Sequence, residues 1–208
     1  CAEWVVTQFA TAKAGLIQVN INPAYRLSEV EYALNKVRCK ALILVEQFKS
    51  SNYIAMLREL APEIALHGPG SLASARLPHL RTLICIGKPH QGFFAFDEVM
   101  ARATEEAHAK LGDITKLLQF DDPINIQFTS GTTGRPKGTV HTHAGCLAQT
   151  GKELRYAFNI QPGEPFFWVT DIGWMMGPWL VLGTTLLGAT MVFYDGAPDY
   201  SPAAVGGS

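Results

Sequence analysis

The stretch FTSGTTGRPKG occupies residues 128–138, and a strand predicted at residues 124–129 runs into it. It combines glycines, hydroxyl side chains and a single lysine. In an open α/β sheet, a loop at the carboxyl end of a strand lies where ligands bind. The stretch therefore predicts an α/β fold with a ligand-binding loop at the edge of its sheet.

The residue types in this loop suit a phosphate group. Gly131, Gly134 and Gly138 allow backbone amides to approach an anion closely. Lys137 supplies a positive charge for distal phosphates, and Pro136 stiffens the chain before it. Side-chain hydroxyls come from Thr129, Ser130, Thr132 and Thr133. The alternative is a flexible Ser/Thr/Gly surface loop, but the preceding strand and the single lysine between proline and glycine favour phosphate binding.

The two commonest nucleotide-binding patterns do not fit the loop. A Walker A loop requires Ser or Thr after its lysine, whereas Gly138 follows Lys137. The Gly-x-Gly-x-x-Gly dinucleotide pattern is also absent, as is the acidic residue that accompanies it.

Outward from the loop, predicted strands and helices alternate along the chain. This order predicts an α/β fold with a largely parallel sheet flanked by helices on both faces. The predicted strands are residues 16–21, 41–45, 81–86, 124–129, 166–170 and 189–194. The predicted helices are residues 2–14, 28–37, 53–60 and 142–158, one or two helices within residues 96–111, and one more between the last two strands. Residues 61–79 are expected to be loop.

Two local features sharpen these expectations. Ser28 and Glu31 have the spacing of a capping box, which predicts that Ser28 caps the helix at residues 28–37. The wholly apolar run at residues 41–45 predicts a strand that is buried on both sides.

The composition limits the class of protein. The 208 residues are 48% hydrophobic and 17% charged with a net charge of −1, as in a globular protein with a sizeable core. Without a Lys/Arg cluster there is no electrostatic case for a nucleic-acid or anionic-membrane partner.

The four cysteines are too far apart for a zinc site or a disulfide framework. No signal peptide is expected, and the start at Cys1 has the character of an internal segment.

Residues 172–194 contain no charge and are long enough to span a bilayer. Five glycines and prolines interrupt them, namely Gly173, Gly177, Pro178, Gly183 and Gly188. We therefore expect a buried helix that ends near Gly188, followed by a buried strand, rather than a transmembrane segment.

At every defining position, residues 128–138 resemble the phosphate loop of the superfamily that contains acyl-CoA synthetases, luciferases and peptide-synthetase adenylation domains. VNINPAY at residues 19–25 is similar to the Asn-Pro-x-Tyr segment of fatty-acyl-CoA synthetases, which favours a CoA ligase over the other two classes. The resemblance implies that residues 1–200 are part of the large N-terminal domain of an adenylate-forming enzyme. The small residues at 201–208 are expected to be a flexible tail.

The resemblance also implies the reaction. ATP and a carboxylic acid give acyl-AMP and pyrophosphate, and coenzyme A then displaces AMP. Lys137 would neutralise charge on the leaving pyrophosphate, and Thr133 would contact Mg²⁺. The ATP phosphates would be bound by Thr129, Ser130, Gly131, Thr132, Thr133, Gly134 and Lys137.

A second stretch, FFWVTDIGWMMG at residues 166–177, is similar to the acyl-pocket segment of short-chain members. Trp174 and Met175 would then wall the acid pocket; the alternative is ordinary core packing. Residues before Thr129 instead resemble medium-chain or fatty-acyl ligases, so the acyl chain length stays open.

His141 and His143 follow the loop, and without a third ligand nearby we expect local hydrogen bonding rather than metal binding. The pair Asp121 and Asp122 is expected to lie in a solvated turn rather than to serve in acid/base chemistry.

The sequence lacks the Tyr-Gly-x-Thr-Glu segment expected of the family to stack on adenine, and no ribose-binding Asp is identifiable. The chain alone is therefore expected to be inactive, as a fragment of a ligase or as a truncated, catalytically incompetent module that binds ATP or polyphosphate. A location in the cytoplasm or an organelle matrix is expected, and the sequence does not indicate an oligomeric state.

Overall fold

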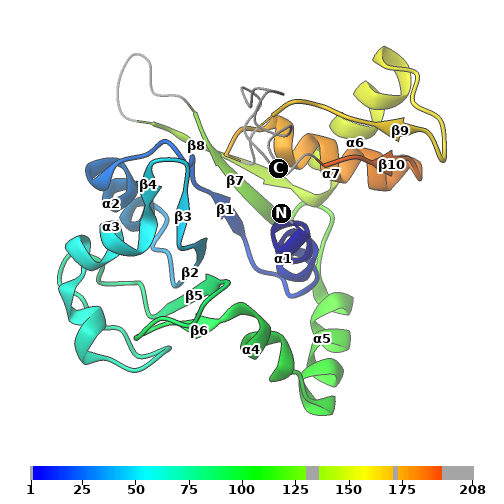
Figure 1. Ribbon diagram of the computed structural model, residues 1–208. Helices are drawn as coiled ribbons and strands as arrows, with labels where there is room; N and C mark the ends of the chain where they lie inside the picture. The colour runs from blue at the N-terminus through cyan, green and yellow to red at the C-terminus, as the bar shows by residue number, and fades with distance from the viewer. Residues whose placement is uncertain (1, 130–135, 171–172, 194–208) are drawn as a thin grey trace, which may run out of the picture. The chain divides into compact units, whose positions relative to one another are not determined.

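The computed structural model describes residues 2–129, 136–170 and 173–193, and the chain divides into two compact units (Figure 1). Unit 1 comprises Cys1–Asn20, Leu117–Thr129 and Gly138–Ser208, and unit 2 comprises Ile21–Lys116 and Ser130–Lys137. The predicted domain at residues 1–200 stays a prediction, and the predicted tail at 201–208 lies outside the described residues.

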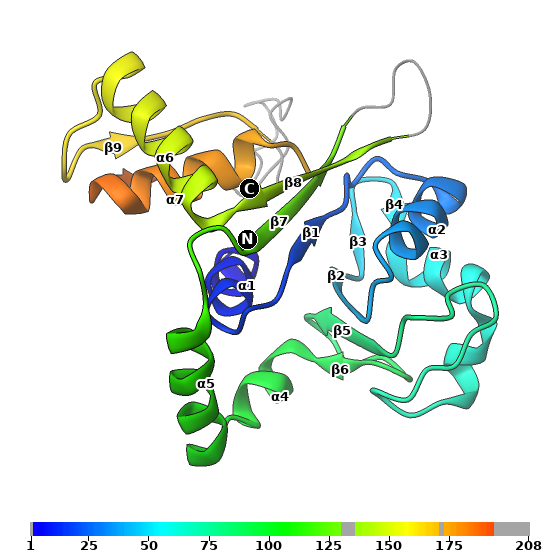
Figure 2. The same ribbon diagram turned by 180° about the vertical axis from the view of Figure 1, so that it is seen from behind.

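Unit 1 is built around a sheet of three strands with the order β1-β7-β8. β1 is parallel to β7, and β8 runs antiparallel to β7; all three lie side by side in Figure 2. A second pair, β9 and β10, is also parallel. The elements are α1 (Ala2–Lys13), β1 (Gln18–Asn20), β7 (Pro123–Phe128), β8 (Gly138–Thr142), α6 (His143–Lys152), a π-helical turn (Glu153–Ala157), β9 (Pro165–Phe166), α7 (Met176–Leu187) and β10 (Thr190–Met191).

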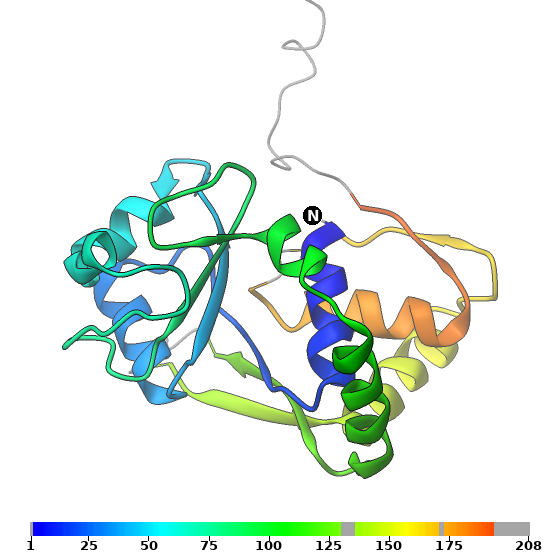
Figure 3. The same ribbon diagram turned by 90° about the horizontal axis from the view of Figure 1, so that it is seen from below.

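Helix α7 is the central hydrophobic element of unit 1. It packs against α6, and the two run alongside each other in Figure 3. Trp179 and Leu180 of α7 form a core with Leu154 and Ile160, while Leu182 packs with other core residues. Gly188 ends the helix with a φ of 67°, a left-handed conformation that suits glycine. The helix of the charge-free stretch thus ends at the predicted glycine, but the strand after it is not buried as predicted: Thr190 of β10 is exposed, because β10 lies in a sheet of two short strands. In the described part of the chain, no helix combines the length and the hydropathy that a membrane span requires.

Unit 2 contains a parallel sheet with the order β2-β5-β6 and a small antiparallel hairpin, β3-β4. Its elements are α2 (Leu27–Lys36), β2 (Ala41–Val45), β3 (Gln47–Phe48), β4 (Ser51–Asn52), α3 (Tyr53–Leu60), a 3₁₀ helix (Pro62–Leu66), β5 (Thr82–Ile86), β6 (Phe94–Ala95), α4 (Phe96–Ala101) and α5 (Glu105–Leu117), of which Leu117 falls in unit 1.

One apolar core holds unit 2 together. Leu57 and Leu60 of α3 pack with Leu83 of β5 and with leucines from the segment between them. Each side chain fully removed from water in this way contributes about 1.5–3 kcal/mol. The segment between the 3₁₀ helix and β5 is an irregular loop that is anchored in this core, because Leu72, Leu77 and Leu80 are all buried there.

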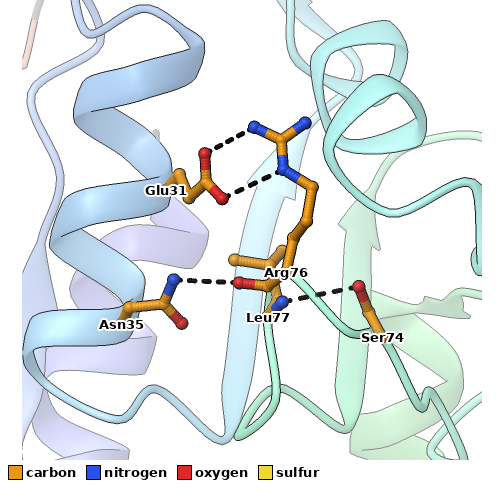
Figure 4. A network of polar contacts seen from close by, with 5 residues as sticks. All are labelled: Glu31, Asn35, Ser74, Arg76 and Leu77. Carbon is orange, nitrogen blue, oxygen red and sulfur yellow. Dashed lines mark hydrogen bonds and ion pairs between the residues drawn. The ribbon is translucent and has the colours of Figure 1, made fainter.

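A polar network attaches the same loop to α2 (Figure 4). The guanidinium of Arg76 donates to both carboxylate oxygens of Glu31 at 3.0 and 2.5 Å. Asn35 donates to the carbonyl of Arg76 at 2.9 Å, and Leu77 donates to the hydroxyl of Ser74 at 3.4 Å. The ion pair holds the pKa of the Glu31 carboxyl below its usual value, through the hydrogen bonds from Arg76 and its charge.

Glu31 is therefore not the capping residue that the sequence predicted. The N-cap of helix α2 lies two residues earlier, at Arg26 rather than Ser28. The carboxylate of Glu29 accepts the Arg26 backbone amide at 2.8 Å. A guanidinium has no acceptor atom, so only this half of a capping box forms. The predicted cap at Ser28 is wrong because the carboxylate of Glu31 binds the guanidinium of Arg76 instead of the start of the helix.

The predicted α/β class with parallel strands is confirmed, but several details differ. β9 is Pro165–Phe166 rather than residues 166–170, and β10 is Thr190–Met191 rather than residues 189–194, because among the described residues only these pair with each other. β2 is only partly buried, since it lies at the edge of its sheet and has β5 as its one neighbour there. Residues 138–142, expected to belong to the loop and the start of a helix, form β8, because they pair along β7.

Candidate functional site

The candidate loop connects two paired strands. β7 ends at Phe128, and Phe128 pairs with Gly138, the first residue of β8. The predicted phosphate-binding residues Ser130, Gly131, Thr132, Thr133 and Gly134 lie outside the described residues. Thr129 and Lys137, which flank them, are both exposed. The two ends of the loop are thus fixed by strand pairing.

Gly138 is required at the end of the loop by close packing. A Cβ atom at this position would lie 2.9 Å from Cγ2 of Ile126 on the facing strand. Real Cβ atoms do not approach other atoms this closely without a shift, and here the neighbour is a rigid β-branched side chain. The third glycine of the stretch therefore serves strand packing in β8, which is separate from any contact with an anion.

The residue before Lys137 is held from helix α2. The hydroxyl of Tyr32 donates to the carbonyl of Pro136 at 3.4 Å, a long hydrogen bond. Tyr32 carried no signal in the sequence analysis, since its position relative to the loop depends on the tertiary structure.

The sheet beneath the loop has a polar face. Side chains alternate along a strand, so Gln18 and Asn20 of β1 share a face with Asn125 and Gln127 of β7. The register places Gln18 beside Asn125 and Asn20 beside Gln127. All four residues are buried, with at most 8% of their surface exposed.

A chain of hydrogen bonds crosses this face. The indole of Trp4 donates to Oδ1 of Asn20 at 3.0 Å, and Nε2 of Gln18 donates to the same oxygen at 2.9 Å. Nδ2 of Asn20 donates to Oε1 of Gln127 at 3.2 Å. Nε2 of Gln127 then donates to the backbone carbonyl of Gly173. The chain thus links α1, β1 and β7 to the residue before Trp174.

Two other side-chain amides in the same unit, those of Gln8 and Asn125, are also buried. Neither amide atom of Gln8 or of Asn125 has a hydrogen-bond partner among the described residues. Gln8 is 0% and Asn125 1% exposed. A buried amide without partners costs free energy, so Asn125 contrasts with Gln127, two residues further along the same strand.

The predicted acid-pocket residues differ in their surroundings. Trp174 is 45% exposed. Met175 packs against a core cluster formed by Ile124, Cys146 and Leu182. Met175 therefore makes the core contacts expected under the alternative to an acid-pocket role. The pocket role of Trp174 and Met175 stays a prediction.

Aromatic residues on both sides of this segment form a cluster. Phe158, Phe166, Trp168 and Trp179 pack with ring centroids 5.5–6.3 Å apart. The indole of Trp179 donates to Glu153 at 2.7 Å. These contacts hold β9 against α7.

The Asn-Pro-x-Tyr segment is a turn with a buried aromatic residue. Oδ1 of Asn22 accepts the amide of Ala24 at 2.9 Å, and its carbonyl accepts the amide of Tyr25 at 3.0 Å. Tyr25 is 7% exposed, and burial raises the pKa of its hydroxyl. Here the segment has a structural function in unit 2.

The histidines that follow the loop and the aspartate Asp122 that precedes it make local contacts. His141 pairs with Asn125 across β8 and β7, and burial lowers the pKa of its imidazole. The amide of His143 donates to the carbonyl of Asp122, whose carboxylate accepts the amide of Gln119 at 2.8 Å. No group of three or more His, Cys, Asp or Glu side chains that could bind a metal occurs in residues 2–129, 136–170 and 173–193.

Comparisons with known proteins agree over nearly the whole chain. A family model described as "AMP-binding enzyme" matches residues 1–206. The mitochondrial medium-chain acyl-CoA ligase ACSF2 of Danio rerio is 50% identical over 141 residues, which are 68% of this chain and 23% of that protein. Its counterpart from Rattus norvegicus is 48% identical over 198 residues, 88% of this chain and 32% of that protein.

Among solved structures, the acetoacetyl-CoA synthetase from Streptomyces lividans superposes with a TM-score of 0.76 and 29% identity, over 95% of this chain and 29% of that one. The chain thus spans about a quarter to a third of the length of these relatives.

Proposed function

The chain belongs to the AMP-binding enzyme family, and from this premise we propose that it carries the phosphate-binding loop of an ATP-dependent, AMP-forming acyl-CoA ligase. The family expected from residues 128–138 is confirmed. The proposed reaction joins a carboxylic acid to AMP with release of pyrophosphate and then transfers the acyl group to coenzyme A.

The observation that carries the proposal is the hairpin that holds the loop. Phe128 and Gly138 are paired, so Thr129 and Lys137 begin and end the connection on the same edge of the sheet. Lys137 is exposed there. In the proposed role its charge stabilises the pyrophosphate as it leaves, and Thr129 with residues 130–134 binds the ATP phosphates.

Mg²⁺ would suit this proposal, since it would supply positive charge to the phosphates, and the hydroxyl of Thr133 is its proposed contact. Trp174 and Met175 are the proposed walls of the acid pocket. The substrate is a small carboxylic acid, and medium-chain acids are favoured because the two ligases above carry that name. The same names favour a mitochondrial matrix over the cytoplasm as the proposed location.

The test is ATP–pyrophosphate exchange by the full-length protein, measured with a series of acids of increasing chain length. We expect exchange that depends on the acid and on Mg²⁺, with a maximum at medium chain length. Absence of exchange with every acid would contradict the proposed function. A maximum at acetate or acetoacetate would keep the reaction and reject the medium-chain substrate.

A further inference from the structure

The amide chain on the polar face of unit 1 has a defined direction. An indole N–H can only donate and a backbone carbonyl can only accept. Trp4 at one end therefore requires Oδ1 of Asn20 to face it, which turns Nδ2 of Asn20 toward Oε1 of Gln127. Nε2 of Gln127 is then left to donate to Gly173. Each amide has one orientation that satisfies both of its neighbours.

In this chain of hydrogen bonds, Gln127 is the residue next to both the proposed phosphate loop and the proposed acid pocket. It is two residues before Thr129, at the start of the phosphate loop, and its side chain holds the carbonyl of Gly173, the residue before Trp174. Its own carbonyl accepts the hydroxyl of Thr139 on β8 at 2.8 Å. With 4% of its surface exposed, Gln127 exchanges these bonds with water only at a high cost.

We propose that Gln127 is a positioning residue that fixes the acid-binding segment at Gly173 and Trp174 relative to the strand entering the phosphate loop, with Asn20 and Trp4 orienting its amide. The inference rests on the proposed function, because it specifies how the acid and the phosphates are aligned. In a reaction between two bound substrates, a displacement of about 1 Å costs on the order of 10²-fold in rate.

Replacement of Gln127 by glutamate gives a sharp test. An ionised carboxylate keeps the acceptor for Asn20 but places a second acceptor against the Gly173 carbonyl. A protonated carboxyl group has the same shape as the amide and donates to Gly173 again. Burial raises the pKa of such a carboxyl group, so the contact should return as the pH falls. The elements around β7 carry other titratable groups, namely His141 on β8 and Glu3 and Lys13 on α1. These groups are present in both Gln127→Glu and the wild type, so their effect cancels when kcat/KM of the variant is divided by that of the wild type.

The experiment compares Gln127→Glu, Gln127→Met and the matched control Asn125→Leu in the full-length protein. Asn125 is on the same strand and face and is equally buried, but its amide has no partner among the described residues. We expect Gln127→Met to lower kcat/KM for the acid by roughly 10- to 100-fold at all pH values. Gln127→Glu should recover toward wild type as the pH falls, and Asn125→Leu should leave kcat/KM unchanged.

Hydrogen exchange of the backbone amides at residues 174–177 provides a second measurement that needs no activity. Exchange there should be faster in Gln127→Met than in wild type and unchanged in Asn125→Leu. If the wild-type protein shows no acid-dependent ATP–pyrophosphate exchange, the proposed function fails while hydrogen exchange still tests the contact. The positioning role would be overturned if Gln127→Met and Asn125→Leu changed kcat/KM and hydrogen exchange equally. It would also be overturned if the ratio of kcat/KM between Gln127→Glu and wild type did not change with pH. If Gln127→Met fails to fold, the pH dependence of Gln127→Glu decides alone.

Discussion

At the residue scale, the stretch at residues 128–138 contains positions with different functions. Lys137 is proposed to act on ATP, whereas Gly138 is required by the packing of β8 against Ile126. Both belong to the same short motif, so a substitution at either would lower activity for a different reason. Separate measurements of rate and stability distinguish the two.

Lys137→Met should reduce the rate of adenylate formation without loss of stability. Removing one preorganised charge or donor from a developing negative charge costs on the order of 10²–10³ in kcat. The measurement is ATP–pyrophosphate exchange at saturating ATP. Lys110→Met is the control, since Lys110 lies on α5 and pairs only with Glu106 at the surface among the described ion pairs. Equal loss in both variants would contradict the role of Lys137.

Gly138→Ala should destabilise unit 1. The new Cβ would meet Cγ2 of Ile126 at 2.9 Å, and overpacking of this kind costs about 1–3 kcal/mol. Urea unfolding measures the change in the free energy of unfolding. The double variant with Ile126→Ala should show a positive coupling, because the clashing atom is gone. Gly112→Ala is the control: nothing lies within 4 Å of a Cβ there, so its stability should not fall.

At the element scale, the packing of α7 on α6 and the following turn depends on small residues. A Cβ at Gly183 would overlap the side chain of Leu154, which is 0% exposed. A Cβ at Gly151 of α6 would lie 2.6 Å from Cδ2 of Leu186. The helices therefore approach each other closely because each presents a glycine to a leucine of the other segment.

Gly183→Ala should consequently lower the midpoint of thermal unfolding by several degrees. The clash with Leu154 is expected to exceed the roughly 1 kcal/mol that alanine gains over glycine in a helix. Thermal unfolding followed by circular dichroism checks this. Gly183→Ala combined with Leu154→Val should be less destabilised than the sum of the two single variants. An increase in the midpoint for Gly183→Ala alone would show that the helices separate easily.

The same scale shows why some elements were predictable. The bounds of α3 and β2 agree with the sequence prediction, because each is a single apolar pattern between clear breaks. Strand β8 was missed, since Gly138, Thr139 and Val140 form a strand only through pairing with β7. The predicted cap of α2 was wrong for a similar reason: a distant residue, Arg76, binds Glu31.

At the scale of the whole molecule, the chain corresponds to about a quarter to a third of its relatives. We predict that the 208 residues alone do not catalyse ATP–pyrophosphate exchange, because the adenine- and ribose-binding segments implied by the family resemblance are not identifiable in this sequence. The measurement is exchange by the isolated chain beside the full-length protein. Acid-dependent exchange by the isolated chain would refute the prediction.

The sequence by itself determined the family, the α/β class and the position of the proposed phosphate loop. These depend on local order along the chain: an apolar strand, then glycines and hydroxyls, then a lysine. The tertiary structure alone decided that β8 pairs with β7, that Gly138 serves packing, and that Gln127 holds Gly173, 46 residues away. Such contacts depend on which strands become neighbours and on which amide finds a partner, and residue order alone does not specify either.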